Sequence, residues 1–320
     1  MNGAVRVTAL PPVSEAATDR YERLRLSIAG IGFELAWAGA PPAQERSLKF
    51  YREFLSDRDH SSGENEINVR LQVHCGELPN LERETSIFDA VANHWRLFRS
   101  NGHAVFEMFH TLPPHPLMQV SMMAPDFSSG DVYVRPRKTG RRPTWSLPRV
   151  MRPFGELLLI QHLLSQRRGI LVHALGVSDQ GEGLLFIGRS GAGKSTLANL
   201  YKRYKGVTIL GDERVIATKE EGRFWLSGTP WPGGAFRVSG HRVPLRKIFF
   251  LEHGSCNALI ADARLTHYGL LFQQLFLPFW HGEALGFAVN FAHELIAALP
   301  AHRLAFVNDR TAVEFLRAHR

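Results

Sequence analysis

Alternation of apolar and polar residues dominates the first half of the chain. It runs through Arg23–Trp37, Ile67–Cys75 and Trp95–Phe109, the last of which is interrupted by an Asn-Gly pair. A period of two predicts strands, and Asn-Gly between two alternating runs predicts a tight hairpin. Ser47–Asp57 fits either a short helix or another strand. We therefore expect residues 1–150 to form a smaller, strand-rich α+β domain, mainly antiparallel, with one or two helices and a role in recognising an acceptor or partner.

The pattern changes after a basic, proline-containing stretch, Val134–Pro153, which we interpret as a linker or the edge of a second domain. A broad apolar face that ends in a glycine predicts a helix over Pro153–Gly169. Later segments alternate between strand and helix patterns. We expect strands over Gly169–Asp179, Glu182–Gly188, Thr208–Val215, Leu245–Gly254 and His302–Val307, and a helix over Gly286–Leu299. Arg223–Gly234 is expected to be a strand that runs into a Gly/Pro loop. This succession predicts an α/β domain with a mixed sheet over residues 151–320.

Composition and charge limit the classes of protein and of partner that fit this sequence. The 320 residues are 44% hydrophobic and 21% charged, which is typical of a globular protein. The net charge is +8, and the Lys and Arg residues that produce it are scattered along the chain. This distribution favours binding of anions such as nucleotides, or of an acidic partner, over binding of nucleic acid. Cys75 and Cys256 are far apart, as expected of free thiols in a reducing cytosol. Without a secretory signal or an apolar run of membrane-spanning length, the sequence predicts a soluble cytoplasmic protein with no membrane partner.

Histidines in the first half lack the spacing of a metal site. We expect them to be ordinary surface or core residues: His60, His74, His94, His103, His110 and His115.

A glycine-rich motif carries the strongest chemical signal. "GRSGAGKS" fits G-x-x-x-x-G-K-[ST], with an apolar run before it and a helical pattern after it. Glycines let successive N–H groups face phosphate oxygens, Lys194 adds a charge between the outer phosphates, and the Ser195 hydroxyl is a ligand for Mg²⁺. The motif predicts a site for a nucleoside triphosphate, ATP with Mg²⁺, formed by Gly188, Arg189, Ser190, Gly191, Ala192, Gly193, Lys194, Ser195 and Thr196.

Two adjacent carboxylates, Asp212 and Glu213, follow Lys194 by only 18 and 19 residues, at the end of an apolar run. The spacing is much shorter than in transporter-type ATPases, which excludes that architecture. One carboxylate of such a pair could hold the metal while the other accepts a proton from an attacking hydroxyl. The alternative is that both face solvent in a turn. His173 is a lone histidine on a predicted strand, and its spacing alone indicates a structural role.

Together, "LVHALGV", "GEGLLFIGRSGAGKSTLANL" and "ILGDERV" resemble the catalytic domain of HPr kinase/phosphorylase and its kinase-like relatives. The histidine, the loop and the acidic pair occur in the same order and at nearly the same spacing. The resemblance implies a fold related to the ATP-dependent phosphoenolpyruvate carboxykinases, with loop and acidic strand as neighbours in the sheet. The chain lacks the "LEVRGLG"-type segment of the true HPr enzyme, so the resemblance is to the kinase-like members.

The same resemblance implies roles for individual residues. Asp212 would be the base for an incoming hydroxyl, His173 would tune or hydrogen-bond that carboxylate, and Glu213 would help to hold Mg²⁺ with Ser195 and Asp212. It also implies an oligomer, since the related kinases are commonly oligomeric.

Two classes of function therefore stand at this point. The first is a kinase that moves the γ-phosphate of ATP to a hydroxyl, on a serine of a protein or peptide or on a small molecule. The second is a nucleotide-binding regulatory or scaffold module that hydrolyses ATP slowly or not at all. Three arginines that follow the Gly/Pro loop are either surface charges or a source of one cation for the transferring phosphate: Arg237, Arg242 and Arg246.

Overall fold

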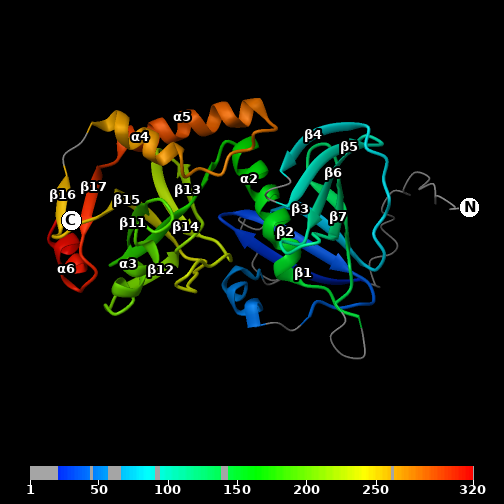
Figure 1. Ribbon diagram of the computed structural model, residues 1–320, viewed down its shortest axis with the longest axis horizontal. Coiled ribbons are helices and arrows are strands. Elements are labelled where there is room, and N and C mark those ends of the chain that lie inside the picture. Colours follow the sequence, from blue (N-terminus) through cyan, green and yellow to red (C-terminus); the bar gives the residue numbers. More distant parts are fainter. Residues whose placement is uncertain are drawn as a thin grey trace, which may run out of the picture.

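The computed structural model describes residues 21–43, 46–56, 66–90, 94–137, 143–260 and 263–319. His60, residues 1–20 and the middle of the basic stretch lie outside these ranges. Figure 1 shows two sheet-containing halves side by side, with the N-terminal half on the right and the C-terminal half on the left. No helix in the described ranges is long and apolar enough to cross a membrane.

The first sheet has eight strands, in the order β1-β2-β3-β8-β7-β6-β5-β4. They are β1 (Glu22–Ile28), β2 (Ile31–Trp37), β3 (Ile67–Cys75), β4 (Thr85–Ala90), β5 (Trp95–Ser100), β6 (His103–Phe109), β7 (Leu117–Met123) and β8 (Ser129–Val134). Neighbours are antiparallel except β2–β3 and β3–β8, which are parallel. The mainly antiparallel arrangement expected of the first half is therefore confirmed, although the sheet as a whole is mixed.

Two-residue turns close two hairpins of this sheet. Asn101 and Gly102 have φ values of 49° and 78°, as a tight hairpin turn requires, so the predicted hairpin is confirmed. Arg23–Trp37 alternates without interruption but is folded back at Ala29 and Gly30, whose φ values are 50° and 74°. Ala-Gly is a weaker turn signal than Asn-Gly, which explains why the pattern did not separate the two strands. Between β2 and β3 the chain forms the short 3₁₀ turns η2 (Arg46–Phe50) and η3 (Arg52–Phe54).

The segment between the two sheets is largely buried. It contains α1 (Leu147–Val150), the π-turn η5 (Met151–Gly155) and α2 (Glu156–Ser165), and α2 lies between the halves in Figure 1. Trp145 and Met151 are almost fully buried. Where it is described, the end of the stretch interpreted as a linker therefore packs into the core.

The second sheet follows the order β12-β10-β11-β15-β14-β13-β9, with β17 pairing with β15 and β16. Its strands are β9 (Gly169–Val172), β10 (Ala174–Asp179), β11 (Glu182–Ile187), β12 (Val207–Gly211), β13 (Val215–Glu220), β14 (Arg223–Gly228), β15 (Arg242–His253), β16 (Ala258–Ile260) and β17 (Ala301–Phe306). β15 is parallel to β11 and β17, and the other pairs are antiparallel, so the expected mixed sheet is confirmed.

One expectation about this sheet is wrong. The strand that leads into the glycine-rich loop, β11, and the strand that carries the acidic pair, β12, are not neighbours, because β10 lies between them and is antiparallel to both. β11 and β12 consequently run in the same direction, and their carboxyl ends meet at the same edge of the sheet. The predicted strand over Gly169–Asp179 is also divided, at His173, into β9 and β10, which lie in different parts of the sheet.

Helices cover the second sheet: α3 (Lys194–Tyr201), α4 (Arg264–Phe272), α5 (Gly282–Ala298) and α6 (Thr311–Ala318). Residues of β11 alternate between two apolar clusters. Leu184 and Phe186 pack with α3 and α6, whereas Leu185 and Ile187 belong to a larger core that extends through α2 and α5 into the first sheet. Burial on both faces explains why β11 is a continuous apolar run in the sequence.

Candidate functional site

The glycine-rich motif lies between β11 and α3, as its flanking patterns predicted. Gly191 and Gly193 have φ values of 85° and 96°, which favour glycine. A Cβ atom on Gly188 would lie 2.7 Å from the Cβ atom of Ala192, and one on Gly193 would lie 2.6 Å from the Cζ atom of Phe306. All three glycines are therefore needed for this loop, which ends at a helix N-terminus, where anions are stabilised.

Lys194 is buried and spans the loop. Its Nζ atom donates hydrogen bonds to the carbonyl oxygens of Gly188, at 2.5 Å, and Arg189, at 3.2 Å. Burial lowers the pKa of Lys194, and the carboxylates of Glu213 and Asp212 oppose that shift. The ammonium group is thus held against the loop by both backbone and charge.

Asp212 is the carboxylate that the structure places at the loop. It directly follows β12 and is only 2% exposed. Its Oδ2 atom accepts hydrogen bonds from Ser195 Oγ at 3.1 Å and from Ala235 N at 2.6 Å, and its Oδ1 atom accepts one from Gly233 N at 2.8 Å. The alternative that Asp212 faces solvent in a turn is therefore wrong, because these bonds join it to the glycine-rich loop and to the Gly/Pro loop after β14.

Ser195 and Asp212 fit a magnesium site in their chemistry. A hydroxyl and a carboxylate supply the hard oxygen atoms that Mg²⁺ prefers, and Mg²⁺ usually takes one or two carboxylates together with phosphate oxygens and water. In the described part of the chain, no group of three or more His, Cys, Asp and Glu side chains is placed to hold a metal. A metal at this loop would therefore depend on the phosphates for much of its coordination.

The Glu213 side chain lies in a cluster of arginine side chains and does not share the hydrogen bonds of Asp212. Its Oε1 atom lies 2.9 Å from Nη1 of Arg214 and 3.9 Å from Nη2 of Arg152. Arg214 Nε lies 2.7 Å from Glu156 Oε2, without hydrogen-bond geometry, and the guanidinium group stacks 4.9 Å from the ring centre of Phe276. The predicted role of Glu213 as a metal ligand stays a prediction, and this ion-pair cluster holds its side chain beside the loop.

Sequence reasoning missed this cluster. The available signal was Glu156, an acidic residue at the start of α2 directly before the apolar run LLLI, because a charged side chain that is buried there needs a partner of opposite charge. Burial and the positive charge of Arg214 both lower the pKa of Arg152, which lies at the edge of the same cluster.

His173 occupies the break between β9 and β10. Its backbone N–H donates to the carbonyl oxygen of Gln274 at 2.8 Å. Burial lowers the pKa of His173; the charges of Lys194 and Arg214 act in the same direction, and Glu213 opposes them. Among the described residues no hydrogen bond joins His173 to Asp212, so the direct contact implied by the resemblance is not observed.

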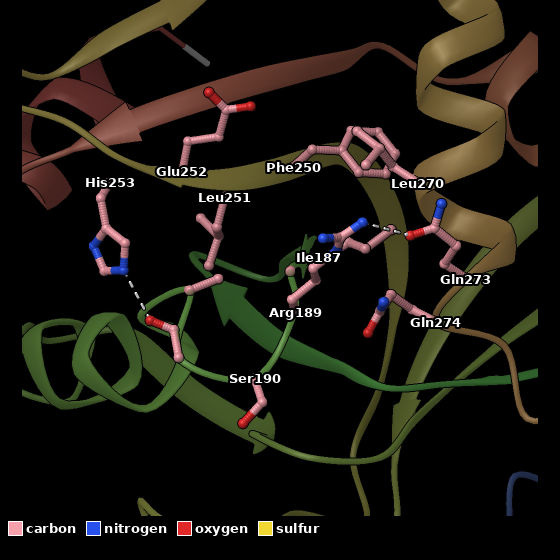
Figure 2. A pocket seen from close by; sticks show the side chains of 13 residues that line it. Ile187, Arg189, Ser190, Phe250, Leu251, Glu252, His253, Leu270, Gln273 and Gln274 are labelled. Atoms are coloured by element: carbon pink, nitrogen blue, oxygen red, sulfur yellow. Dashed lines mark hydrogen bonds between the residues drawn. The ribbon is translucent and has the colours of Figure 1, made fainter.

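A cavity of about 580 Å³ adjoins the loop (Figure 2). Residues 187–192 form one wall, and the ends of β15 and α4 form the other. Arg189 Nη2 donates to Gln273 Oε1 at 3.2 Å, and His253 Nε2 donates to the carbonyl oxygen of Gly191 at 2.9 Å, so both polar contacts tie the loop to these walls. The volume lies in the range of small-molecule sites.

The arginines after the Gly/Pro loop are directed elsewhere. Arg242 forms an ion pair with Glu220 at 2.7 Å, and Arg246 lies 3.6 Å from Glu182. For these two arginines the structure favours the surface-charge interpretation. Arg237 lines a separate groove.

No protein-family model matches the sequence. No curated protein matches it either. Among solved structures, the HPr(Ser) kinase/phosphatase from Coxiella burnetii is similar to this chain at a TM-score of 0.26 and 12% identity, over 47% of this chain and 91% of that chain. At that TM-score a common fold is not established, so the resemblance to the kinase family rests on the sequence motifs.

Proposed function

We propose that the chain is an ATP- and Mg²⁺-dependent kinase that transfers the γ-phosphate to a hydroxyl group. The contact between Ser195 Oγ and Asp212 Oδ2, at 3.1 Å, is the observation that carries the proposal. It joins a glycine-dependent loop at a helix N-terminus to a buried carboxylate from another strand. Phosphoryl transfer needs these two parts together, because positioning and charge stabilisation provide most of its catalysis.

Each residue has a defined task in the proposal. The loop amides and Lys194 bind the phosphate oxygens and stabilise the charge that develops during transfer. Ser195 and Asp212 Oδ2 would hold Mg²⁺, which neutralises charge on the phosphates. Asp212 Oδ1, whose one hydrogen bond from the described residues is that of Gly233 N, takes the proton of the acceptor hydroxyl as the hydroxyl oxygen attacks the γ-phosphorus. The bond to the β-phosphate oxygen breaks, and the products are ADP and a phosphate ester.

The hydrogen bonds to Asp212 also support a second candidate, the nucleotide-binding module without phosphotransfer. Its Oδ2 atom accepts hydrogen bonds from Ser195 and Ala235 and its Oδ1 atom accepts one from Gly233, so both carboxylate oxygens already hold the two loops together, a structural role that needs no proton transfer. A module of this kind would bind ATP and transfer nothing.

Incubation with γ-labelled ATP and Mg²⁺ separates the two candidates. We would compare the wild type with Lys194→Ala and Asp212→Asn, using serine-bearing peptides, free serine and a cell lysate as acceptors. The proposal predicts transfer by the wild type and a loss of roughly 10²–10⁴-fold in Asp212→Asn, the usual contribution of a general base. Asp89→Asn, which changes a partly exposed carboxylate of β4, is the matched control and should transfer at the wild-type rate. ATP binding by the wild type without transfer to any acceptor would overturn the kinase in favour of the module.

A further inference from the structure

A second concave surface lies away from the glycine-rich loop, along β12. It is a groove of about 830 Å³ between the C-terminal end of α3, strand β12 and residues 237–241. β12 is the edge strand of its sheet, and β10 is its one partner among the strands of the described ranges. Near its end, Ser239 N donates to the carbonyl oxygen of Leu210 at 2.9 Å, so residues 238–239 cover the part of the edge closest to Asp212.

The remaining edge of β12 offers backbone groups for pairing. Gln180 N donates to the carbonyl oxygen of Gly206 at 2.9 Å, so that carbonyl group points towards β10, and the N–H group of Val207, on the opposite side of the same peptide group, points away from it. The N–H and C=O groups of one strand residue lie on the same side, and that side alternates along the strand. The N–H groups of Val207 and Ile209 and the carbonyl oxygen of Val207 therefore face away from β10, on the side of the groove that these residues line. No hydrogen bond from another described residue reaches these three groups. The groove can therefore accept a short extended segment as an additional strand.

The charged side chains of the groove indicate what kind of segment would bind there. The exposed side chains of Lys202, Arg203 and Arg237 line the groove, and none of them forms an ion pair within the described residues. The acidic side chain in the groove, Glu53, is occupied by Ser239 Oγ at 2.7 Å and Gly240 N at 3.1 Å. Three cations therefore face a single carboxylate, that of Glu53, and the net charge of the groove is positive.

We propose that this groove docks an extended, acidic polypeptide segment, which adds to the edge of β12 while its carboxylates pair with Lys202, Arg203 and Arg237. The inference rests on the proposed function and defines its acceptor as a protein or peptide. Thr208 and Asp212 are four residues apart, which corresponds to about 13 Å along an extended chain. A hydroxyl a few residues from the docked segment is therefore within reach of Asp212.

The test is direct binding of a defined probe, measured without nucleotide. The probe is a fluorescein-labelled peptide that alternates Glu and Val over seven residues, and binding is followed by fluorescence anisotropy. We expect Arg203→Glu combined with Arg237→Glu to weaken binding at least tenfold. Arg223→Glu, an exposed arginine on β14 outside the groove, is the matched control and should bind within twofold of the wild type.

Two further probes separate strand pairing from simple charge attraction. The same peptide with alternate amides methylated keeps its charge but cannot pair with an edge strand, and we expect at least tenfold weaker binding. A single-stranded oligonucleotide of equal charge should also bind at least tenfold more weakly. Equal binding of either probe, or no binding of the parent peptide, overturns the docking proposal.

The docking and kinase proposals fail separately. Peptide binding that depends on Arg203 and Arg237, without any phosphate transfer, would retain the docking site and contradict the kinase. Transfer to serine peptides with the same KM in wild type and in the Arg203→Glu/Arg237→Glu variant would retain the kinase and contradict docking.

Discussion

Gly233 leaves no room for a side chain beside the Asp212 carboxylate. A Cβ atom at this position would lie 2.9 Å from Asp212 Oδ2 and 3.0 Å from its Cγ atom. The carboxylate cannot simply rotate away, because Ser195, Gly233 and Ala235 all donate hydrogen bonds to it. At the residue scale, glycine in the Gly/Pro loop therefore allows the backbone to approach and hold the acidic group.

We predict that Gly233→Ala displaces Asp212 and its loop together. The added methyl group should destabilise the protein by about 1–3 kcal/mol, the usual cost of overpacking, and should reduce phosphate transfer. Urea unfolding and the transfer assay measure the two effects. Gly76→Ala is the control, because a Cβ atom there meets nothing within 4 Å, and its stability should change by less than about 0.5 kcal/mol. Wild-type stability and activity in Gly233→Ala would show that the carboxylate does not need this close contact.

At the scale of elements, an ion pair between Arg317 on α6 and the fully buried Asp179 at the end of β10 connects the last helix to the second sheet. Arg317 donates from Nε to Asp179 Oδ2 at 3.0 Å and from Nη2 to Asp179 Oδ1 at 2.8 Å. The Asp179 side chain is 0% exposed, and its hydrogen bond raises the pKa of Arg317. This bidentate contact anchors the last helix at the end of β10.

Arg317→Ala should therefore destabilise the protein by about 3 kcal/mol, because it leaves a buried carboxylate without its cation. We choose the lower end of the range for buried pairs because Arg317 itself is 29% exposed. Arg310→Ala is the control at the other end of α6, where the side chain is 81% exposed, and we expect a change below about 0.5 kcal/mol. Equal midpoints of urea unfolding for the two variants would contradict the anchoring role.

Local patterns predicted the elements much better than their arrangement. The Asn101-Gly102 hairpin, β3, and the succession of β11, glycine-rich loop and α3 were predicted because turn chemistry and periodicity are local properties. The insertion of β10 between β11 and β12 was not, because strand order depends on long-range packing. The Arg214–Glu156 pair was not predicted for the same reason, because its members are 58 positions apart in the sequence. Lys194, Ser195 and Asp212 were identified by motif and spacing, and the Gly233 and Ala235 contacts were not.

At the scale of the whole molecule, the two sheets share one apolar core with α2 between them. Polar contacts also cross between the halves. His162 on α2 donates from Nε2 to the carbonyl oxygen of Phe127 at 3.0 Å, and Arg168 donates to the carbonyl oxygen of Gly30 at 2.9 Å. Burial lowers the pKa of His162, although the hydrogen bond to Phe127 and the charge of Asp126 oppose the shift.

This shift predicts that the protein loses stability in mild acid. Below about pH 6.5 the unfolded chain protonates His162 while the folded chain does not, so the free energy of unfolding falls until the pH reaches the lower folded pKa. The slope for one group is at most about 1.4 kcal/mol per pH unit. His162→Gln keeps a donor for Phe127 and should have a shallower slope between pH 7 and 5 in urea unfolding. At pH 7.5, where His162 is neutral in both states, a difference in the free energy of unfolding between the wild type and His162→Gln measures any loss of packing. A variant whose stability changes with pH as steeply as that of the wild type would contradict the role assigned to His162.

The most direct test of the account is equilibrium binding of a non-hydrolysable ATP analogue, with and without Mg²⁺, to the wild type, Lys194→Ala and Asp212→Asn. If the phosphates bind in the loop of residues 188–196, loss of the Lys194 charge should weaken binding by roughly 10–100-fold, which corresponds to about 1.5–3 kcal/mol for a charged hydrogen bond. Asp212→Asn should still bind the analogue but lose the gain in affinity that Mg²⁺ gives the wild type. Wild-type affinity in Lys194→Ala would contradict the phosphate site, and with it the function proposed for this chain.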